Sequence, residues 1–236
     1  MALVLIFLAA MIKYSPLPEI ETGEEASIVN DAGNKTSILQ FPQLILGAAA
    51  LFFYVGVEVI AGDTIGMYGK NLGLPFFGKL TSYTMAFMVL GYIIGIITIP
   101  RLIRQEKALV LSTALGFVFS LGILFSSPSD TGISNVIFGW LGVPVIPNSV
   151  FFLALLGLAN AMVWPAIWPL ALEGLGRYTK IGSAILIMGI AGGALLPPLY
   201  GVLSNNFSPQ GSYLVLLPCY LFILYYALKG HKKRVW

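Results

Sequence analysis

The sequence predicts an all-α membrane protein, a bundle of six transmembrane helices. The chain of 236 residues is 58% hydrophobic and only 10% charged, whereas a soluble domain carries about 25% charged residues. It also contains six apolar stretches close to the ~17 to 25 residues that a helix needs to cross a bilayer. These predicted spans are residues 43–67, 78–100, 107–126, 149–172, 181–204 and 211–229.

The segments around the spans predict the domain organisation. Met1–Ile12 is apolar but too short to cross a bilayer, and we interpret it as the remnant of a preceding transmembrane helix. A signal peptide is the alternative, although no basic residue precedes the apolar run. Residues 13–40 contain Pro, Glu and Gly without apolar periodicity, which predicts a linker. Residues 41–229 then form the six-helix bundle, and residues 230–236 form a basic tail.

The basic residues predict the orientation in the membrane. Of the 13 Lys and Arg residues, only Lys70 and Lys79 fall on one side of the predicted bundle, and the other eleven fall on the opposite side. Lys and Arg accumulate in cytoplasmic loops. We therefore expect a multi-pass protein of the inner (plasma) membrane with a cytoplasmic linker and a cytoplasmic C-terminus.

Several function classes find no support in the sequence. The single cysteine, Cys219, lies in an apolar run, and no Cys/His spacing of a metal site is present. No phosphate-binding loop or catalytic set is visible, so we expect neither an enzyme nor a metal or organic cofactor. The net charge of +3 is explained by membrane topology rather than by nucleic acid binding. His231 is interpreted as a solvated residue of the basic tail.

Glu58 is the most informative residue because it lies well inside the first predicted span. An ionised carboxylate there costs several kcal/mol unless it faces water or a partner. Such a group could exchange an ion or proton, or it could bind the hydroxyls of a polar solute; a structural glutamate is the alternative. Tyr54 shares its helix face at i−4. Asp63, roughly 140° around the helix, is a second candidate for ion coupling or an interfacial residue.

The fourth predicted span places an amide and two indoles on one helix face. Asn160, Trp164 and Trp168 follow one another at intervals of four residues. Amides bind hydroxyl groups, and indole rings pack against the apolar face of a pyranose, so this face suits a sugar. The alternatives are an interhelical hydrogen bond for Asn160 and an interfacial position for Trp168. Pro165 and Pro169 predict a kink in the same helix.

Small residues predict close helix packing and an internal repeat. Gly91 and Gly95, and likewise Gly189 and Gly193, are spaced four residues apart. Loops rich in Gly and Lys follow both the first and the fourth span, on opposite sides of the membrane. That placement is typical of an inverted repeat of three plus three helices.

Four segments resemble the fucose permease and glucose/galactose transporter family of the major facilitator superfamily. They are Phe53–Val59 (FYVGVEV), Trp164–Ile167 (WPAI), Glu173–Ser183 (EGLGRYTKIGS) and Met188–Gly193 (MGIAGG). Their order and spacing resemble the seventh to twelfth helices of that family over residues 41–228. Fucose permeases have glutamine at the position of Glu58, so the glutamate here is more similar to the glucose/galactose branch.

The resemblance implies the C-terminal half of a major facilitator fold. It further implies cation-coupled symport of a hexose such as glucose, galactose or fucose, with H⁺ or Na⁺ as the coupling ion. Tyr54, Glu58 and Asn160 would then face the central sugar cavity, with Trp164 and Trp168 beside them.

The family has twelve helices, so we expect the partner of this chain to be an N-terminal six-helix half, and truncation to explain its absence from the sequence. The alternatives are a separately encoded N-terminal half and a second copy of this chain. Alternating access needs two bundles. The alternative function is a non-transporting membrane module, either a relic or a sugar-sensing subunit.

Overall fold

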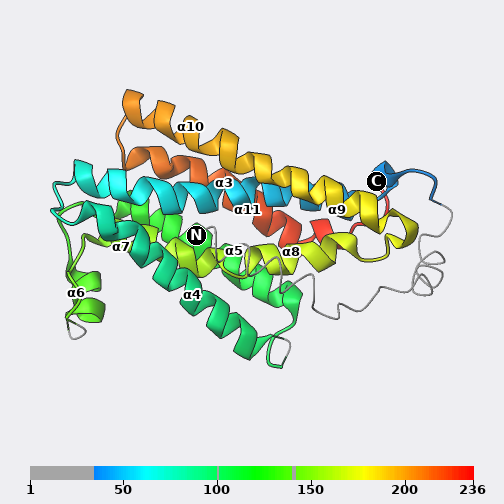
Figure 1. Cartoon of the computed structure of the whole chain (residues 1–236), viewed down its shortest axis with the longest axis horizontal. Coiled ribbons are helices and arrows are strands. Elements are labelled where there is room, and N and C mark those ends of the chain that lie inside the picture. Colours follow the sequence, from blue (N-terminus) through cyan, green and yellow to red (C-terminus); the bar gives the residue numbers. More distant parts are fainter. Residues whose placement is uncertain (1–34, 100, 140–141) are drawn as a thin grey trace, which may run out of the picture.

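The computed structural model describes residues 35–99, 101–139 and 142–236, and this part of the chain contains six membrane-spanning helical segments (Figure 1). They are Pro42–Asn71, Phe77–Thr98, Gln105–Phe125, Asn148–Leu172, Gly176–Asn206 and Gly211–Lys232. Each contains one of the predicted spans to within two residues, so the predicted six-helix bundle is confirmed. The proposed helix remnant at 1–12 and most of the proposed linker at 13–40 lie outside the described residues.

Helix α3 (Pro42–Asn71) is the centre of the bundle and runs along the long axis of the molecule (Figure 1). It contacts the helices of the second, fourth, fifth and sixth spans. Glycine and alanine on α3 allow these close contacts: a β-carbon at Gly47 would lie 2.7 Å from the Cβ of Ala171. The second and third spans are single helices, α4 (Leu80–Thr98) and α5 (Gln105–Phe125).

The fourth span is interrupted, as its prolines predict. It consists of α7 (Asn148–Asn160) and α8 (Val163–Leu172), separated by a turn at residues 161–162. Proline has no N–H to donate within a helix. Pro169 therefore leaves the carbonyl of Pro165 without its usual helical donor, and the side-chain amide of Gln105 on α5 donates to that carbonyl at 3.0 Å. The kink is thus supported by a neighbouring helix.

The last two spans are also built from shorter pieces. The fifth consists of α9 (Thr179–Met188), a 3₁₀ turn at Gly189–Ala191 and α10 (Gly192–Asn206). The sixth begins with a 3₁₀ turn at Gly211–Val215 and continues as α11 (Leu216–Leu228).

The predicted glycine contacts lie where α4 meets the turn after α7 and where the 3₁₀ turn of the fifth span meets α3. A β-carbon at Gly91 would lie 2.6 Å from the Cβ of Ala161, and one at Gly189 would lie 2.9 Å from the Cβ of Leu51.

The loops after the first and fourth spans share a local structure. Gly73 and Gly174 both have positive φ, 75° and 70°, a conformation that glycine adopts without strain at the end of a helix. Each loop then leads through a 3₁₀ turn, at Phe77–Lys79 and at Gly176–Tyr178, into the next span. This correspondence supports the predicted repeat.

A short helix, α6 (Gly132–Phe138), lies between the third and fourth spans and was not predicted. Asn148, the first residue of α7, organises it. The side-chain oxygen of Asn148 accepts hydrogen bonds from the backbone N–H groups of Ile133 and Ser134, and its amide donates to Asp130 at 2.9 Å.

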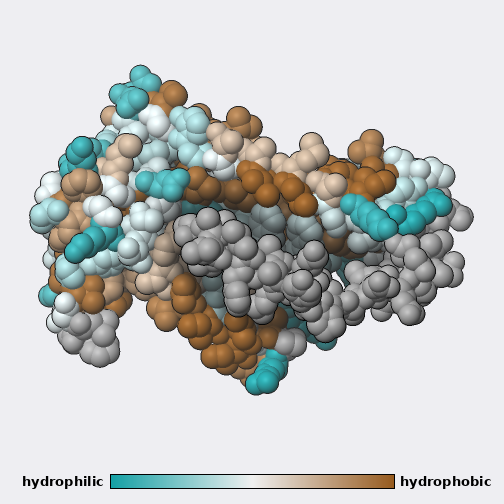
Figure 2. All heavy atoms as spheres, viewed as in Figure 1, coloured by the Kyte–Doolittle hydropathy of each residue, from teal (hydrophilic) through white to brown (hydrophobic). Residues whose placement is uncertain are grey.

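The surface is apolar along the middle of the helices and hydrophilic near the ends (Figure 2). The second and fifth spans are the least buried, with 22% and 28% of their most apolar windows inside the protein. The exposed apolar side chains on α4 include Val89, Ile93, Ile94, Ile96 and Ile97. Such faces are suited to lipid or to another membrane-embedded partner.

Candidate functional site

A buried tyrosine and a half-buried glutamate form the polar centre of α3. The hydroxyl of Tyr54 donates to the carboxylate of Glu58 at 2.9 Å, and the i, i+4 spacing places both groups on one face of the helix. Tyr54 is only 1% exposed. The bond to Tyr54 occupies one position on a carboxylate that can accept several hydrogen bonds.

The two indoles of α8 continue this cluster. Trp164 and Trp168 stack with ring centroids 5.9 Å apart and an interplanar angle of 14°. Trp164 also meets the ring of Tyr54 edge to face, at 6.3 Å between centroids. Tyr54, Glu58, Trp164 and Trp168 therefore form a continuous set of contacts between the first and fourth spans, which we call the Tyr-Glu-Trp cluster.

Asn160 makes a different contact. Its side-chain oxygen accepts a hydrogen bond from the hydroxyl of Tyr220 on α11 at 2.8 Å, and both side chains are fully buried. This is the interhelical bond that the sequence offered as the alternative for Asn160. The side-chain nitrogen of Asn160 has no hydrogen-bond partner, so both of its N–H donors remain unused beside the turn at residues 161–162.

Asp63 is not part of the Tyr-Glu-Trp cluster. It is exposed on α3, more than one turn beyond Glu58 and on another face of the helix.

A second polar cluster, which the sequence did not reveal, joins the first, fourth and sixth spans. The hydroxyl of Tyr68 donates to the hydroxyl of Ser149 at 2.9 Å. Thr64 donates to its own helix at the carbonyl of Ile60, so the hydroxyl of Tyr213 is the donor in the 2.8 Å contact with Thr64. Isolated hydroxyl residues in apolar runs give no periodic signal, and only the packing brings them together.

The basic residues of the linker, the loop after the fourth span and the tail meet at one end of the molecule. Arg234 forms an ion pair with Glu173, and Lys35 donates to the carbonyl of Arg234 at 2.8 Å. The prediction that His231 is solvated was wrong: it is 2% exposed, and its Nδ1 donates to the carbonyl of Tyr226 at 3.0 Å. The short turn Gly230–Lys232 places it against α11 and α5.

The arrangement of the six spans is that of one half of a major facilitator transporter. The chain matches the crystal structure of the major facilitator superfamily transporter FucP in the outward conformation with a TM-score of 0.71, over 95% of this chain and 51% of FucP. The sequence identity in that match is 18%, so this similarity establishes the fold. The predicted fold class is confirmed.

The sequence is similar to named sugar transporters. It is 28% identical to a glucose/galactose transporter of Brucella abortus over 98% of this chain and 52% of the relative. It is 26% identical to an L-fucose-proton symporter of Haemophilus influenzae over 97% of this chain and 50% of the relative. The predicted resemblance is thus confirmed, and these relatives are transporters rather than enzymes. The chain spans about half the length of the curated relatives it matches, and it matches no family model.

Proposed function

We propose that this chain is the C-terminal half of a cation-coupled hexose symporter of the inner membrane, with H⁺ or Na⁺ as the coupling ion. The similarity to glucose/galactose transporters across 98% of the chain supports this proposal most directly. Because alternating access requires two bundles around a shared site, an N-terminal six-helix bundle supplies the other half of the site.

The least buried spans are candidates for the contact with that second bundle. The second and fifth spans leave most of their surface uncovered, whereas the fourth is 67% buried in its most apolar window.

The Tyr-Glu-Trp cluster supplies the groups that a sugar site needs. The free lone pairs of Glu58 accept hydrogen bonds from sugar hydroxyls, and Tyr54 fixes the carboxylate. The stacked pair Trp164 and Trp168 offers an apolar ring surface to the C–H face of the sugar. The side-chain oxygen of Asn160 joins this site only when it exchanges its hydrogen bond from Tyr220 for one from the sugar. Glu58 and Asp63 are the candidate groups for ion coupling.

The basic end supports a cytoplasmic C-terminus. Lys35, Arg177 and Arg234 are brought together there by direct contacts, and basic residues accumulate on the cytoplasmic side of membrane proteins.

The proposal is tested by uptake of labelled glucose, galactose and fucose into cells that lack their own hexose carriers. The chain is expressed alone and fused behind the N-terminal six-helix half of the Brucella abortus relative, and we expect uptake only from the fusion. Uptake by the chain alone would point to a carrier made of two copies. Absence of uptake from both, at normal membrane abundance, would favour the non-transporting module.

The same fusion tests the site. We expect Glu58→Ala to lower uptake about 10- to 100-fold, the effect of losing a hydrogen bond to a charged group worth about 1.5–3 kcal/mol. Lys79→Gln, a change of an exposed charged residue in the turn before α4, is the control and should transport normally. Unchanged uptake by Glu58→Ala at equal membrane abundance would remove Glu58 from the site.

A further inference from the structure

A groove of about 470 Å³ lies between α5 and α11 at the basic end of the molecule. Three charged residues line its polar part: Glu106 and Lys107 in the first turn of α5, and Lys232 in the turn after α11. Val110, Leu111 and Leu228 are among the residues of its apolar part. The groove belongs neither to the Tyr-Glu-Trp cluster nor to the second polar cluster.

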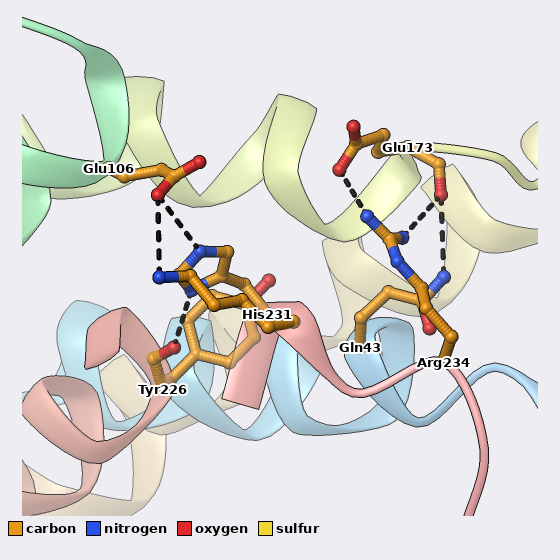
Figure 3. Close-up of polar contacts among 7 residues, drawn as sticks. Gln43, Glu106, Glu173, Tyr226, His231 and Arg234 are labelled. Atoms are coloured by element: carbon orange, nitrogen blue, oxygen red, sulfur yellow. Dashed lines mark hydrogen bonds and ion pairs between the residues drawn. The ribbon is translucent and has the colours of Figure 1, made fainter. Parts of the chain in front are cut away.

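The single acidic group in this lining already has basic partners. The carboxylate of Glu106 lies 3.6 Å from Nε2 of His231 and 3.7 Å from the ammonium group of Lys232 (Figure 3). His231 is buried behind the groove, and its Nε2 makes no hydrogen bond. The two lysines therefore leave a net positive charge at the groove, and Lys107 is exposed there.

The apolar part of the groove faces outward from the bundle. Leu111 is 53% exposed and Leu228 is 49% exposed, so in a membrane both side chains contact the acyl chains. From Lys107 to Ala114, α5 rises by about 10 Å, and along this path the lining changes from charged to apolar. A soluble anion would use only the first part of such a groove.

We propose that this groove is a binding site for an anionic phospholipid. The phosphate binds at Lys107 and Lys232, and an acyl chain lies along Leu111 and Leu228. Basic pockets between helices at a membrane surface are suited to anionic head groups. Because the groove is formed by α5, α11 and the turn after α11, the lipid would hold the tail against the third span.

Thermal unfolding of the full chain in detergent micelles tests the site. Dioleoylphosphatidylglycerol is added at about a hundredfold excess over its own Kd, and dioleoylphosphatidylcholine at the same concentration. We expect the first lipid to raise the unfolding temperature by roughly 5 to 10 °C more than the second. The double variant Lys107→Gln with Lys232→Gln should lose this difference. Lys70→Gln with Lys79→Gln, the basic pair near the opposite end of α3, should keep it. Each variant is compared with itself in the two lipids, so a general loss of stability does not affect the result.

Two further measurements separate the lipid from other ligands. Ala114→Phe fills the apolar part without changing the charge and should also reduce the difference between the lipids. Glycerol 3-phosphate should stabilise the chain far less than the whole lipid. Equal stabilisation by the two lipids, an unchanged effect in the Lys107/Lys232 variant, or full stabilisation by glycerol 3-phosphate would each overturn the proposal.

Discussion

The first three spans and the last three are built on the same plan but differ in continuity. In both sets the first span is the most buried, with 50% and 67% of its apolar window inside the protein, and the second is the least, with 22% and 28%. The loop after the first span of each set contains a glycine with positive φ. Corresponding spans of the two sets therefore rank in the same order of burial, and the loops after their first spans share the same backbone conformation.

The helices of the two sets differ along their length. The first span is one helix of 30 residues, whereas its counterpart is divided at residues 161–162. The fifth span contains a 3₁₀ turn in its interior, whereas the 3₁₀ turns that begin the second and sixth spans lie at the ends of those spans. The breaks observed within the described spans thus fall in the second set. Continuous helices provide a frame, and interrupted helices are the places where a bundle can bend at low cost.

The largest effect is expected at a tight crossing between the two sets. A side chain at Gly157 on α7 would overlap the backbone of α4, with its β-carbon 3.2 Å from the backbone nitrogen of Met88 and still closer to the carbonyl of Thr84. Because a backbone cannot move aside as a side chain can, Gly157→Leu should cost about 3 kcal/mol or more of unfolding free energy. Thermal unfolding and yield of folded protein in detergent measure this. Gly201→Leu on α10, where the added carbon meets open space, is the control, and equal losses in both variants would contradict the prediction.

A smaller effect tests how the break in the fourth span is stabilised. Gln105→Ala removes the donor to the carbonyl of Pro165, which is half-buried, and should cost about 0.5–1.5 kcal/mol, the net contribution of a typical hydrogen bond. Pro169→Ala restores a backbone N–H that can donate to the same carbonyl.

Gln105→Ala should therefore lower the unfolding free energy less in the Pro169→Ala protein than in the unmodified protein. Chemical unfolding of the four proteins gives this coupling energy. Strictly additive changes would show that the amide of Gln105 and the missing N–H of residue 169 do not serve the same carbonyl.

The smallest effect is expected from the ion pair that joins the tail to the loop after the fourth span. Arg234 and Glu173 are 44% and 62% exposed in this pair, and exposed ion pairs contribute at most about 1 kcal/mol. Arg234→Gln should lower the unfolding free energy by less than that, and high salt should remove the difference. Arg101→Gln, in the exposed loop between α4 and α5, is the matched control. A loss of unfolding free energy above about 2 kcal/mol would mean that Arg234 stabilises the protein through contacts other than this ion pair.

The sequence predicted the spans and the kink because both depend on local chemistry. Apolar length defines a span, and Pro165 and Pro169 interrupt a helix wherever they occur in it. The Trp164–Trp168 stack and the Tyr54–Glu58 bond were also accessible, since four-residue spacing brings side chains together within one helix.

The sequence could not identify the tertiary partners of Asn160 and His231. Asn160 was placed on the same face as Trp164, but the turn at 161–162 lies between them, and its partner Tyr220 is 60 residues away. His231 follows the last apolar run beside lysines, a pattern typical of a solvated tail, yet the turn at Gly230–Lys232 folds it under α5. Neither packing arrangement leaves a periodic pattern in the sequence.

The length of α3 has a consequence for bilayer thickness. Its 30 residues extend about 45 Å, whereas the hydrocarbon core is about 30 Å thick. Tilt alone would have to exceed the ~40° observed for transmembrane helices, so the ends of α3 extend into the head groups. Glu58 lies only about 2 Å from the midpoint of the helix, and Asp63 lies about 10 Å from it. A thinner bilayer would therefore bring Asp63 to the head-group boundary while Glu58 stays at the mid-plane, and hydrophobic mismatch would act on the two carboxylates differently.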